Sequence, residues 1–188
     1  MPEPLRILGI AGSLRRASFN RGLLRAAVEL TPAGATIETF DLAAIPIYNE
    51  DVRTQGVPAP VADLRRKIAE AGALLIASPE NNYSVPGVLK NAIDWASRPP
   101  DQPLRRKPVA IMGASNGGFG TVRGQAALRV VLSAVESYAM IKPELFVSRA
   151  QDLCDADGNL KDEPTREKVR AHVEALIAWT RKISAAPV

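Results

Sequence analysis

The sequence predicts an α/β fold in which helices cover both faces of a parallel β-sheet. Short β-rich runs alternate regularly with longer segments of helical periodicity along the chain. The run from Leu74 to Ser78 is almost continuously apolar, as expected for a strand that is buried on both faces of a parallel sheet. Such strict alternation requires right-handed crossover connections, which place the helices on the two faces of the sheet.

The first strand is expected at Leu5 to Ala11, a mainly apolar run that a Gly-Ser turn ends. The first helix is expected at Phe19 to Leu30, because its apolar side chains recur every three or four residues and share one face. The run Thr36 to Phe40 predicts the second strand. Val61 and its apolar partners at helical spacing, up to Ala71, predict the second helix, which begins after two prolines.

The third strand at Leu74 to Ser78 is followed by a helical stripe from Leu89 to Ala96, which must end before two consecutive prolines. Val109 to Gly113 is expected to be the fourth strand. Three further elements follow along the chain: a helix from about Val122 to Ser137, a strand from Pro143 to Val147, and a final helix marked by Val169, Val173, Leu176 and Ile177.

The loop after the first strand, Gly12 to Asn20, has the composition of a phosphate-binding cradle. Unpaired backbone N–H groups and the positive end of the helix would meet there, with Ser13, Ser18 and Asn20 as neutral donors and Arg15 as a charge. The loop is neither a P-loop nor a G-x-G-x-x-G fingerprint. An ordinary turn with Ser18 as the helix N-cap explains the same residues, so the local chemistry leaves both interpretations open.

Two further unusual loops follow the third and fourth strands, at residues 78–88 and 113–120. In open parallel sheets, ligands bind beyond the carboxyl ends of the strands, where the strand order reverses. The three unusual loops therefore predict one binding site at that edge of the sheet.

The first two loops carry two signatures. The pattern G-S-x-R-x-x-S-x-N is met from Gly12 to Asn20, and P-E-aromatic-N-x-S-x-P-G-x-L-K-N-A-I-D-W is met from Pro79 to Trp95 except at Asn81, which replaces the aromatic residue. With these signatures the chain resembles, over essentially its whole length, the NAD(P)H-dependent FMN reductases of the flavodoxin-like fold. The substitution at Asn81 puts flavin packing or subunit contact at that position in question.

The resemblance implies a flavodoxin-like three-layer sandwich with a five-stranded parallel sheet in the order 2-1-3-4-5. It also implies bound FMN, with NADPH or NADH as the co-substrate, and electron transfer to quinones, azo compounds, chromate or free flavin. A homodimer or homotetramer is implied as well. No catalytic side chain is expected, because the flavin performs the hydride transfer itself.

The residues matched to the family divide between the two ends of FMN. Those assigned to the phosphate are Ser13, Arg15, Ser18, Phe19 and Asn20. Those assigned to the ring system are Pro79, Glu80, Asn81, Asn82, Tyr83 and Ser84 on one side, with Ser115, Gly117 and Gly118 on the other. Trp95 is interpreted as a packing residue.

Length and composition limit the number of domains and the kinds of site that the chain can contain. The chain has 188 residues, which favours a single domain over residues 1–188, and it has only one Cys and one His, which excludes a thiol-rich metal site. His172 is expected at the surface or in an interface, Cys154 is expected to be inert, and residues 155–159 are interpreted as a polar turn rather than a calcium loop. With no apolar run of about 18 residues and no signal-peptide pattern, we expect a cytoplasmic protein without a membrane partner.

The formal net charge is +4, yet the two basic runs, at residues 65–67 and 105–107, have acidic neighbours and no interleaved aromatic residues, so no nucleic-acid partner is expected.

The main alternative function is a flavodoxin-like electron carrier, a class that is typically acidic. A module that uses the cradle for another phosphate is a third interpretation. The sequence does not decide between NADH and NADPH, although Arg16 and Arg123 are candidates for binding a 2′-phosphate.

Overall fold

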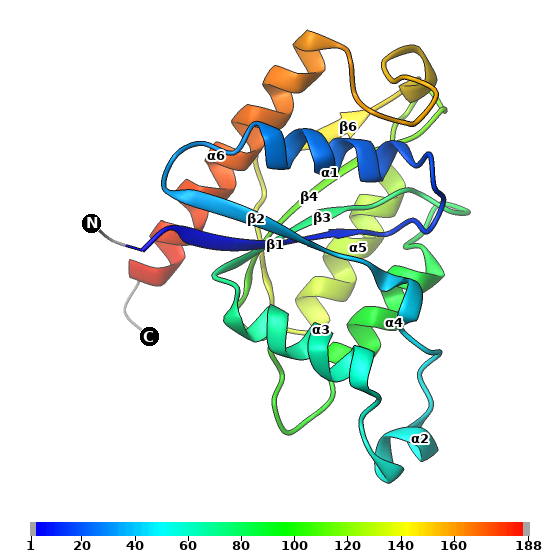
Figure 1. Ribbon diagram of the computed structural model, residues 1–188, viewed down its shortest axis with the longest axis vertical. Helices are drawn as coiled ribbons and strands as arrows, with labels where there is room; N and C mark the ends of the chain where they lie inside the picture. Colours follow the sequence, from blue (N-terminus) through cyan, green and yellow to red (C-terminus); the bar gives the residue numbers. More distant parts are fainter. Residues whose placement is uncertain (1–2, 186–188) are drawn as a thin grey trace.

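The computed structural model describes residues 3–185 and has the predicted alternation of strands and helices (Figure 1). The strands are β1 (Leu5–Ala11), β2 (Ala35–Phe40), β3 (Ala73–Ala77), β4 (Pro108–Ala114), β5 (Tyr138–Ala139) and β6 (Leu145–Val147). The helices are α1 (Phe19–Glu29), α2 (Glu50–Gln55), α3 (Ala59–Glu70), α4 (Gly87–Ala96), α5 (Val122–Ala134) and α6 (Glu163–Ala185).

The sheet is parallel, with the order β2-β1-β3-β4-β5, and β6 also pairs with β4. This confirms the predicted order. The last position of the sheet is divided between two short strands, because β5 pairs with Pro108 and Val109 whereas β6 pairs with residues 112–114. The prediction placed one strand from Pro143 to Val147. Pro143 has no N–H to donate to a neighbouring strand, and the paired segment begins only at Leu145.

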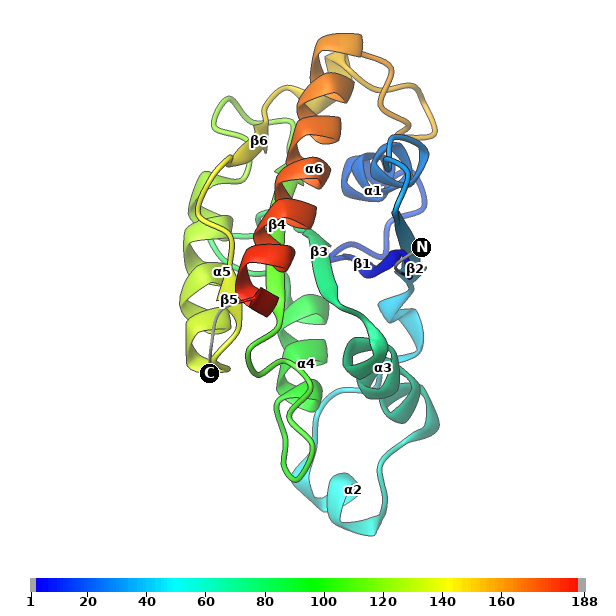
Figure 2. The same ribbon diagram turned by 90° about the vertical axis from the view of Figure 1, so that its left-hand side faces the viewer.

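Helices cover both faces of the sheet, as the two views show (Figures 1 and 2). Two apolar layers hold these helices against the sheet. Alternate side chains of β3 point to opposite faces, so that Leu75 packs in the layer under α1 and α6, whereas Leu74 and Ile76 pack in the layer under α3, α4 and α5. Trp95 of α4 is fully buried in the second layer, as its packing interpretation predicted.

Within the described residues, one α-helix, α2, was not predicted, nor were the short 3₁₀ helices Leu42–Ala44 and Ala150–Asp152. In α2, Asn49 accepts a hydrogen bond from the Asp51 amide at 2.8 Å and so caps the first turn, and Gly56 follows the last residue. None of its residues is buried. Since the helix has no apolar face, its sequence carries no periodicity from which it could be detected.

Candidate functional site

The carboxyl ends of β1, β3 and β4 lie side by side, and the loops that leave them surround a cleft of ≈ 480 Å³. Of the fourteen predicted site residues, the cleft brings together Ser13, Arg15, Ser18, Phe19, Asn20, Pro79, Glu80, Asn81 and Ser115. Its lining also includes Gly12, Leu14, Pro86, Gly87, Val88, Ala114 and Asn116. A cleft of this volume accommodates a ligand of cofactor size.

The β1–α1 loop presents backbone donors to one end of the cleft. Ser18 is the N-cap of α1, and its hydroxyl accepts a hydrogen bond from the Arg21 amide at 3.4 Å. Among the residues that the structure describes, the amides of Phe19 and Asn20 in the first helical turn have no acceptor. Free amides at the positive end of a helix bind anions, so this end of the cleft suits a phosphate.

Asn20 fixes the start of α1 to the end of β4. Its side chain is only 3% exposed, donates to the Ala114 carbonyl and accepts from the Ala114 amide, both at 2.9 Å. The prediction assigned Asn20 to the phosphate as a donor. In the structure the side-chain oxygen and one of the two amide hydrogens serve the scaffold, so the side chain shapes the cleft whatever the ligand.

Two arginines contribute charge near the same loop. Arg15 is exposed, and its guanidinium lies 4.8 Å from the centre of the Phe19 ring. Arg21 donates to the Ser13 carbonyl at 3.0 Å and forms an ion pair of 2.7 Å with Asp41. Arg21 therefore braces the loop from outside the cleft.

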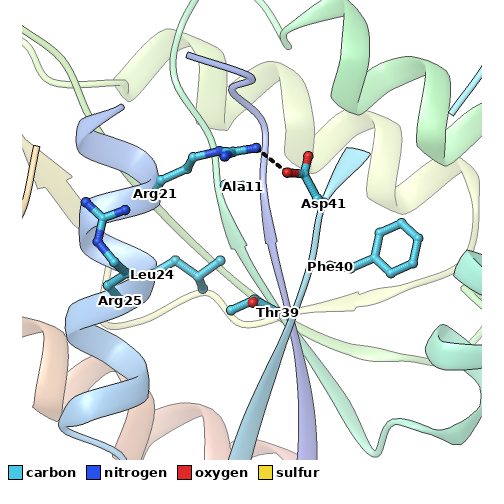
Figure 3. A pocket seen from close by; sticks show the side chains of 7 residues that line it. All are labelled: Ala11, Arg21, Leu24, Arg25, Thr39, Phe40 and Asp41. Atoms are coloured by element: carbon cyan, nitrogen blue, oxygen red, sulfur yellow. Dashed lines mark hydrogen bonds and ion pairs between the residues drawn. The ribbon is translucent and has the colours of Figure 1, made fainter. Parts of the chain in front are cut away.

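That ion pair borders a second, smaller cavity of ≈ 170 Å³ between α1 and the end of β2 (Figure 3). The Arg21 guanidinium points toward the Asp41 carboxylate. Burial alone would raise the pKa of Asp41, but hydrogen bonds from the Ala43 amide and Arg21 lower it, so the carboxylate stays ionised at neutral pH. The pair neutralises itself and leaves the cavity without net charge from these two groups.

The loop after β3 forms a tight hairpin turn at the other end of the cleft. Asn81 and Ser84 pair through hydrogen bonds of 3.2 and 2.9 Å, and Asn82 and Tyr83 between them have positive φ angles of 50° and 63°. This is the geometry of a type I′ turn. Asn82, Tyr83 and Ser84 do not line the cleft, and the Tyr83 side chain is 68% exposed at the tip of the turn.

Glu80 joins this loop to α5. Its carboxylate accepts a hydrogen bond of 2.8 Å from the Gly124 amide in the first turn of α5, whereas the N-cap residue Thr121 makes no side-chain capping bond. A carboxylate at a helix N-terminus satisfies an unpaired amide and interacts favourably with the helix dipole. Glu80, which the sequence analysis assigned to the flavin ring, therefore lines the cleft and also caps a helix.

An arginine between two aromatic rings makes a second connection between these loops. The Arg123 guanidinium lies 4.3 Å from the ring centre of Tyr83 and 4.9 Å from that of Phe119. Both distances are within the range of cation–π attraction. The cluster of Tyr83, Arg123 and Phe119 thus links the loop after β3 to the loop after β4.

The loop after β4 closes on itself. Ser115 lines the cleft, and its hydroxyl donates to the Gly120 carbonyl at 2.5 Å. Gly117 and Gly118 are exposed and do not line the cleft. Asn82, Tyr83, Ser84, Gly117 and Gly118 are thus the predicted site residues that the structure places outside the cleft, and their part in flavin binding stays a prediction.

The sequence prediction did not include seven of the lining residues. Gly12 and the Pro86–Gly87 pair lie inside the two signatures, so the motifs could have identified them. A Cβ at Gly12 would lie 3.2 Å from side-chain atoms of both Leu89 in α4 and Pro79 in the loop after β3. The chain after β1 therefore packs closely against both segments. Leu14 and Val88 are apolar and carry no chemical signal of a site.

The prediction for His172 is wrong. Its side chain is 1% exposed, because it lies on the same face of α6 as Val169, Val173 and Leu176, which packs on the sheet. Burial lowers the pKa of His172 to about 4, although the backbone groups of Pro143 and Ile111 beside the ring act to raise it. The helical spacing of the apolar residues predicted this buried face. Because histidine is polar, His172 was not counted among the residues of that face.

Cys154 is also outside the cleft, and burial raises the pKa of its thiol, as expected for an unreactive cysteine. Over residues 3–185, no cluster of three or more His, Cys, Asp or Glu side chains is arranged to hold a metal ion. In the same range, no helix is both long enough and apolar enough to cross a membrane.

Comparison with known proteins assigns this chain to a family. The family model described as NADPH-dependent FMN reductase matches residues 5–152. The chain is 49% identical to a Pseudomonas aeruginosa protein named NAD(P)H-dependent FMN reductase, over 97% of this chain and 99% of that protein. It is 42% identical to an NAD(P)H:quinone oxidoreductase of Solanum tuberosum, over 95% of this chain and 94% of that protein.

Among solved structures, the flavoenzyme NAD(P)H:(acceptor) oxidoreductase FerB of Paracoccus denitrificans superposes with a TM-score of 0.86 and 32% sequence identity. The superposition covers 95% of this chain and 98% of FerB.

Proposed function

The chain belongs to the NADPH-dependent FMN reductase family, and from this premise we propose that it is an FMN-dependent NAD(P)H oxidoreductase with a quinone as electron acceptor. The observation that carries the proposal is the cleft itself. One end offers free helix amides to an anion, and the other is bordered by Pro79, Pro86 and Gly87 after β3 and by Ser115 after β4. The names of the quinone-reducing relatives support the choice of acceptor.

The residues present fit FMN. The phosphate would bind at the amides of Phe19 and Asn20, with the Ser13 hydroxyl as a further donor and Arg15 as counter-charge. The ring system would lie between the loops after β3 and β4, where Pro79 and Ser115 line the cleft. When bound, FMN supplies the chemistry by accepting a hydride from the nicotinamide and passing electrons to an acceptor.

The side chains that line the cleft then only bind and orient the FMN and the reactants. Arg15 and Glu80 are the titratable groups among the lining residues, and the Glu80 carboxylate already accepts the Gly124 amide. Arginine does not exchange protons at physiological pH. The exposed side chains of Asn81 and Asn116 leave the mouth of the cleft open, as required if NAD(P)H and the acceptor use it in turn.

An absorption spectrum of the purified protein, taken before and after anaerobic addition of NADPH, tests the proposal. We expect flavin bands that bleach within seconds and return when benzoquinone is added. Bands that persist with both NADPH and NADH would support an electron carrier instead. The absence of bands after FMN is supplied would overturn the assignment of the cofactor.

A matched pair of variants tests the phosphate end. Arg15 lines the cleft, whereas its neighbour Arg16 is exposed and does not, so Arg15→Ala and Arg16→Ala remove the same charge at different places. We expect Arg15→Ala to lower FMN affinity about tenfold, because a charge-assisted contact is lost, and Arg16→Ala to have little effect. Equal losses would show that only the general field matters.

A homodimer or homotetramer is part of the proposal. Large apolar side chains exposed on the surface, such as Ile47, Val130 and Ile141, support it because association would cover them. Light scattering checks the proposal, and a monomer at micromolar concentration would contradict it.

A further inference from the structure

We propose that the turn formed by residues 155–159 is a positioning element for the phosphate cradle, and that Gly158 is its point of contact. The turn lies beyond residues 5–152, which the family model matches. In Figure 1 this segment passes beside the first turn of α1. The inference rests on the proposed function, because the anion that the cradle would hold is the phosphate of FMN.

The turn and the start of α1 approach each other without room for side chains. A Cβ at Gly22, in the second turn of α1, would lie 1.7 Å from the Gly158 carbonyl oxygen. A Cβ at Gly158 would lie 2.8 Å from the Ala17 carbonyl oxygen and 3.1 Å from the Ser18 carbonyl carbon. Two glycines thus allow backbone to pack directly on backbone on both sides of the N-cap.

The turn has its own internal bracing. Asp155 accepts hydrogen bonds from the amides of Asp157 and Asn159, at 3.1 and 2.8 Å, and from the Asn159 side chain at 3.0 Å. The Gly158 amide donates to the Asp155 carbonyl at 2.9 Å. This network holds Gly158 in its left-handed conformation, with a φ of 77°.

Arg25 ties the turn to α1 a second time. Its Nε donates to the Asn159 side-chain oxygen at 2.6 Å, and its Nη2 donates to the Asp157 carbonyl at 3.1 Å. Arg25 projects from the same helix as Arg21, as Figure 3 shows, and it does not line the cleft. It therefore holds the turn against α1 without reaching the proposed ligand.

These contacts fix the segment that carries the cradle donors. Gly158 packs on the peptide between Ala17 and Ser18, immediately before the free amides of Phe19 and Asn20. The Ser18 side chain is only 2% exposed, and Asn20 is fixed to Ala114. The segment is held from both sides, and a displacement at Ala17 would move the donors relative to a bound phosphate.

Binding titrations of the flavin-free full-length chain with FMN and with riboflavin test the inference, because riboflavin lacks the phosphate. Gly158→Ala would push the Ala17–Ser18 peptide away. The matched control is Gly34→Ala, at a φ of 87° with nothing within 4 Å, which has the same backbone strain without a contact. We expect Gly158→Ala to weaken FMN binding about tenfold to a hundredfold and riboflavin binding hardly at all, while Gly34→Ala changes neither affinity.

Arg25→Lys keeps the charge, loses the paired hydrogen bonds to the turn and covers the case in which Gly158→Ala does not fold. We expect it to reduce FMN affinity severalfold with riboflavin affinity unchanged. Unchanged FMN affinity in Gly158→Ala, or in Arg25→Lys if Gly158→Ala does not fold, would overturn the inference. So would equal losses for both flavins. If the unmodified chain binds neither flavin, the proposed function itself fails, which is a separate result.

Discussion

The two ends of the cleft are built differently. At the phosphate end, Ser18 and Asn20 are buried, and hydrogen bonds and glycine contacts join the β1–α1 loop to β4 and to the turn at residues 155–159. At the other end, Tyr83 and Phe119 are 68% and 70% exposed, and a hydrogen bond and a cation–π cluster connect the loops. The difference indicates that fixed geometry is concentrated where a permanent charge would bind, and exposure where reactants would exchange.

Gly22→Ala should have the largest effect, because the new Cβ would lie 1.7 Å from a backbone oxygen that no side-chain movement can displace. We expect a loss of about 3 kcal/mol in the free energy of unfolding. Gly118→Ala, at the exposed end with nothing within 4 Å, should change it by less than about 0.5 kcal/mol. Denaturant unfolding measures both, and a similar loss in the two variants would remove the contrast.

Low pH should reduce the free energy of unfolding, because His172 is buried in the core that supports both ends of the cleft. Burial lowers the folded-state pKa of His172 to about 4 from a usual 6.5, so the unfolded chain binds the proton more readily. The contribution of the neutral His172 to the free energy of unfolding should be complete above pH 6.5 and be lost as the pH drops through 4, by about 3 kcal/mol in total. In His172→Phe this part of the pH dependence should disappear, and an unaltered acid slope in that variant would refute the assignment.

Asn20→Ala should destabilise the phosphate end by about 2 kcal/mol, because the Ala114 amide and carbonyl would lose their partner in a buried place. Asn81→Ala, at the exposed hairpin, removes the same kind of side chain and should cost less than about 0.5 kcal/mol. Thermal unfolding of the two variants gives the comparison. Equal shifts in Tm would mean that burial does not distinguish the two asparagines.

Glu80→Ala should give the smallest loss, about 1 kcal/mol, because it removes the carboxylate that caps α5. Glu80→Gln retains a hydrogen-bond acceptor but removes the charge at the helix end, so its smaller loss measures the contribution of the charge. Urea titrations resolve the two values. If Gln behaves like Ala, the contribution is electrostatic and the hydrogen bond itself adds little.

The sequence predicted the parts of the fold that follow from apolar periodicity. The strand positions and most helices agree with the structure, and β3, the clearest apolar run, is buried over its whole length. The strand order also agrees, but it came from the family resemblance and not from periodicity. Two features had no such signal. The helix α2 buries none of its residues, and the final strand position is interrupted at Pro143 and divided between β5 and β6.

For the site, the signatures located the β1–α1 loop and the start of the loop after β3. They could not place Tyr83, because two successive residues with positive φ turn its side chain away from the cleft, and neither is glycine. Nor could they show that Asn20 and Glu80 serve the scaffold, since their partners Ala114 and Gly124 are distant in sequence. The sequence identified residues 155–159 as a polar turn, but it carried no signal that Gly158 packs against α1 or that Arg25 binds Asn159.

The divided strand at the sheet edge has a consequence for how the protein behaves at high concentration. A long, flat, unpaired strand offers a row of N–H and C=O groups on which another chain can assemble. Here that edge consists of segments of 2 and 3 residues, and neither is long enough to act as a template. We therefore expect this border of the sheet to resist the strand-to-strand association that leads to aggregation.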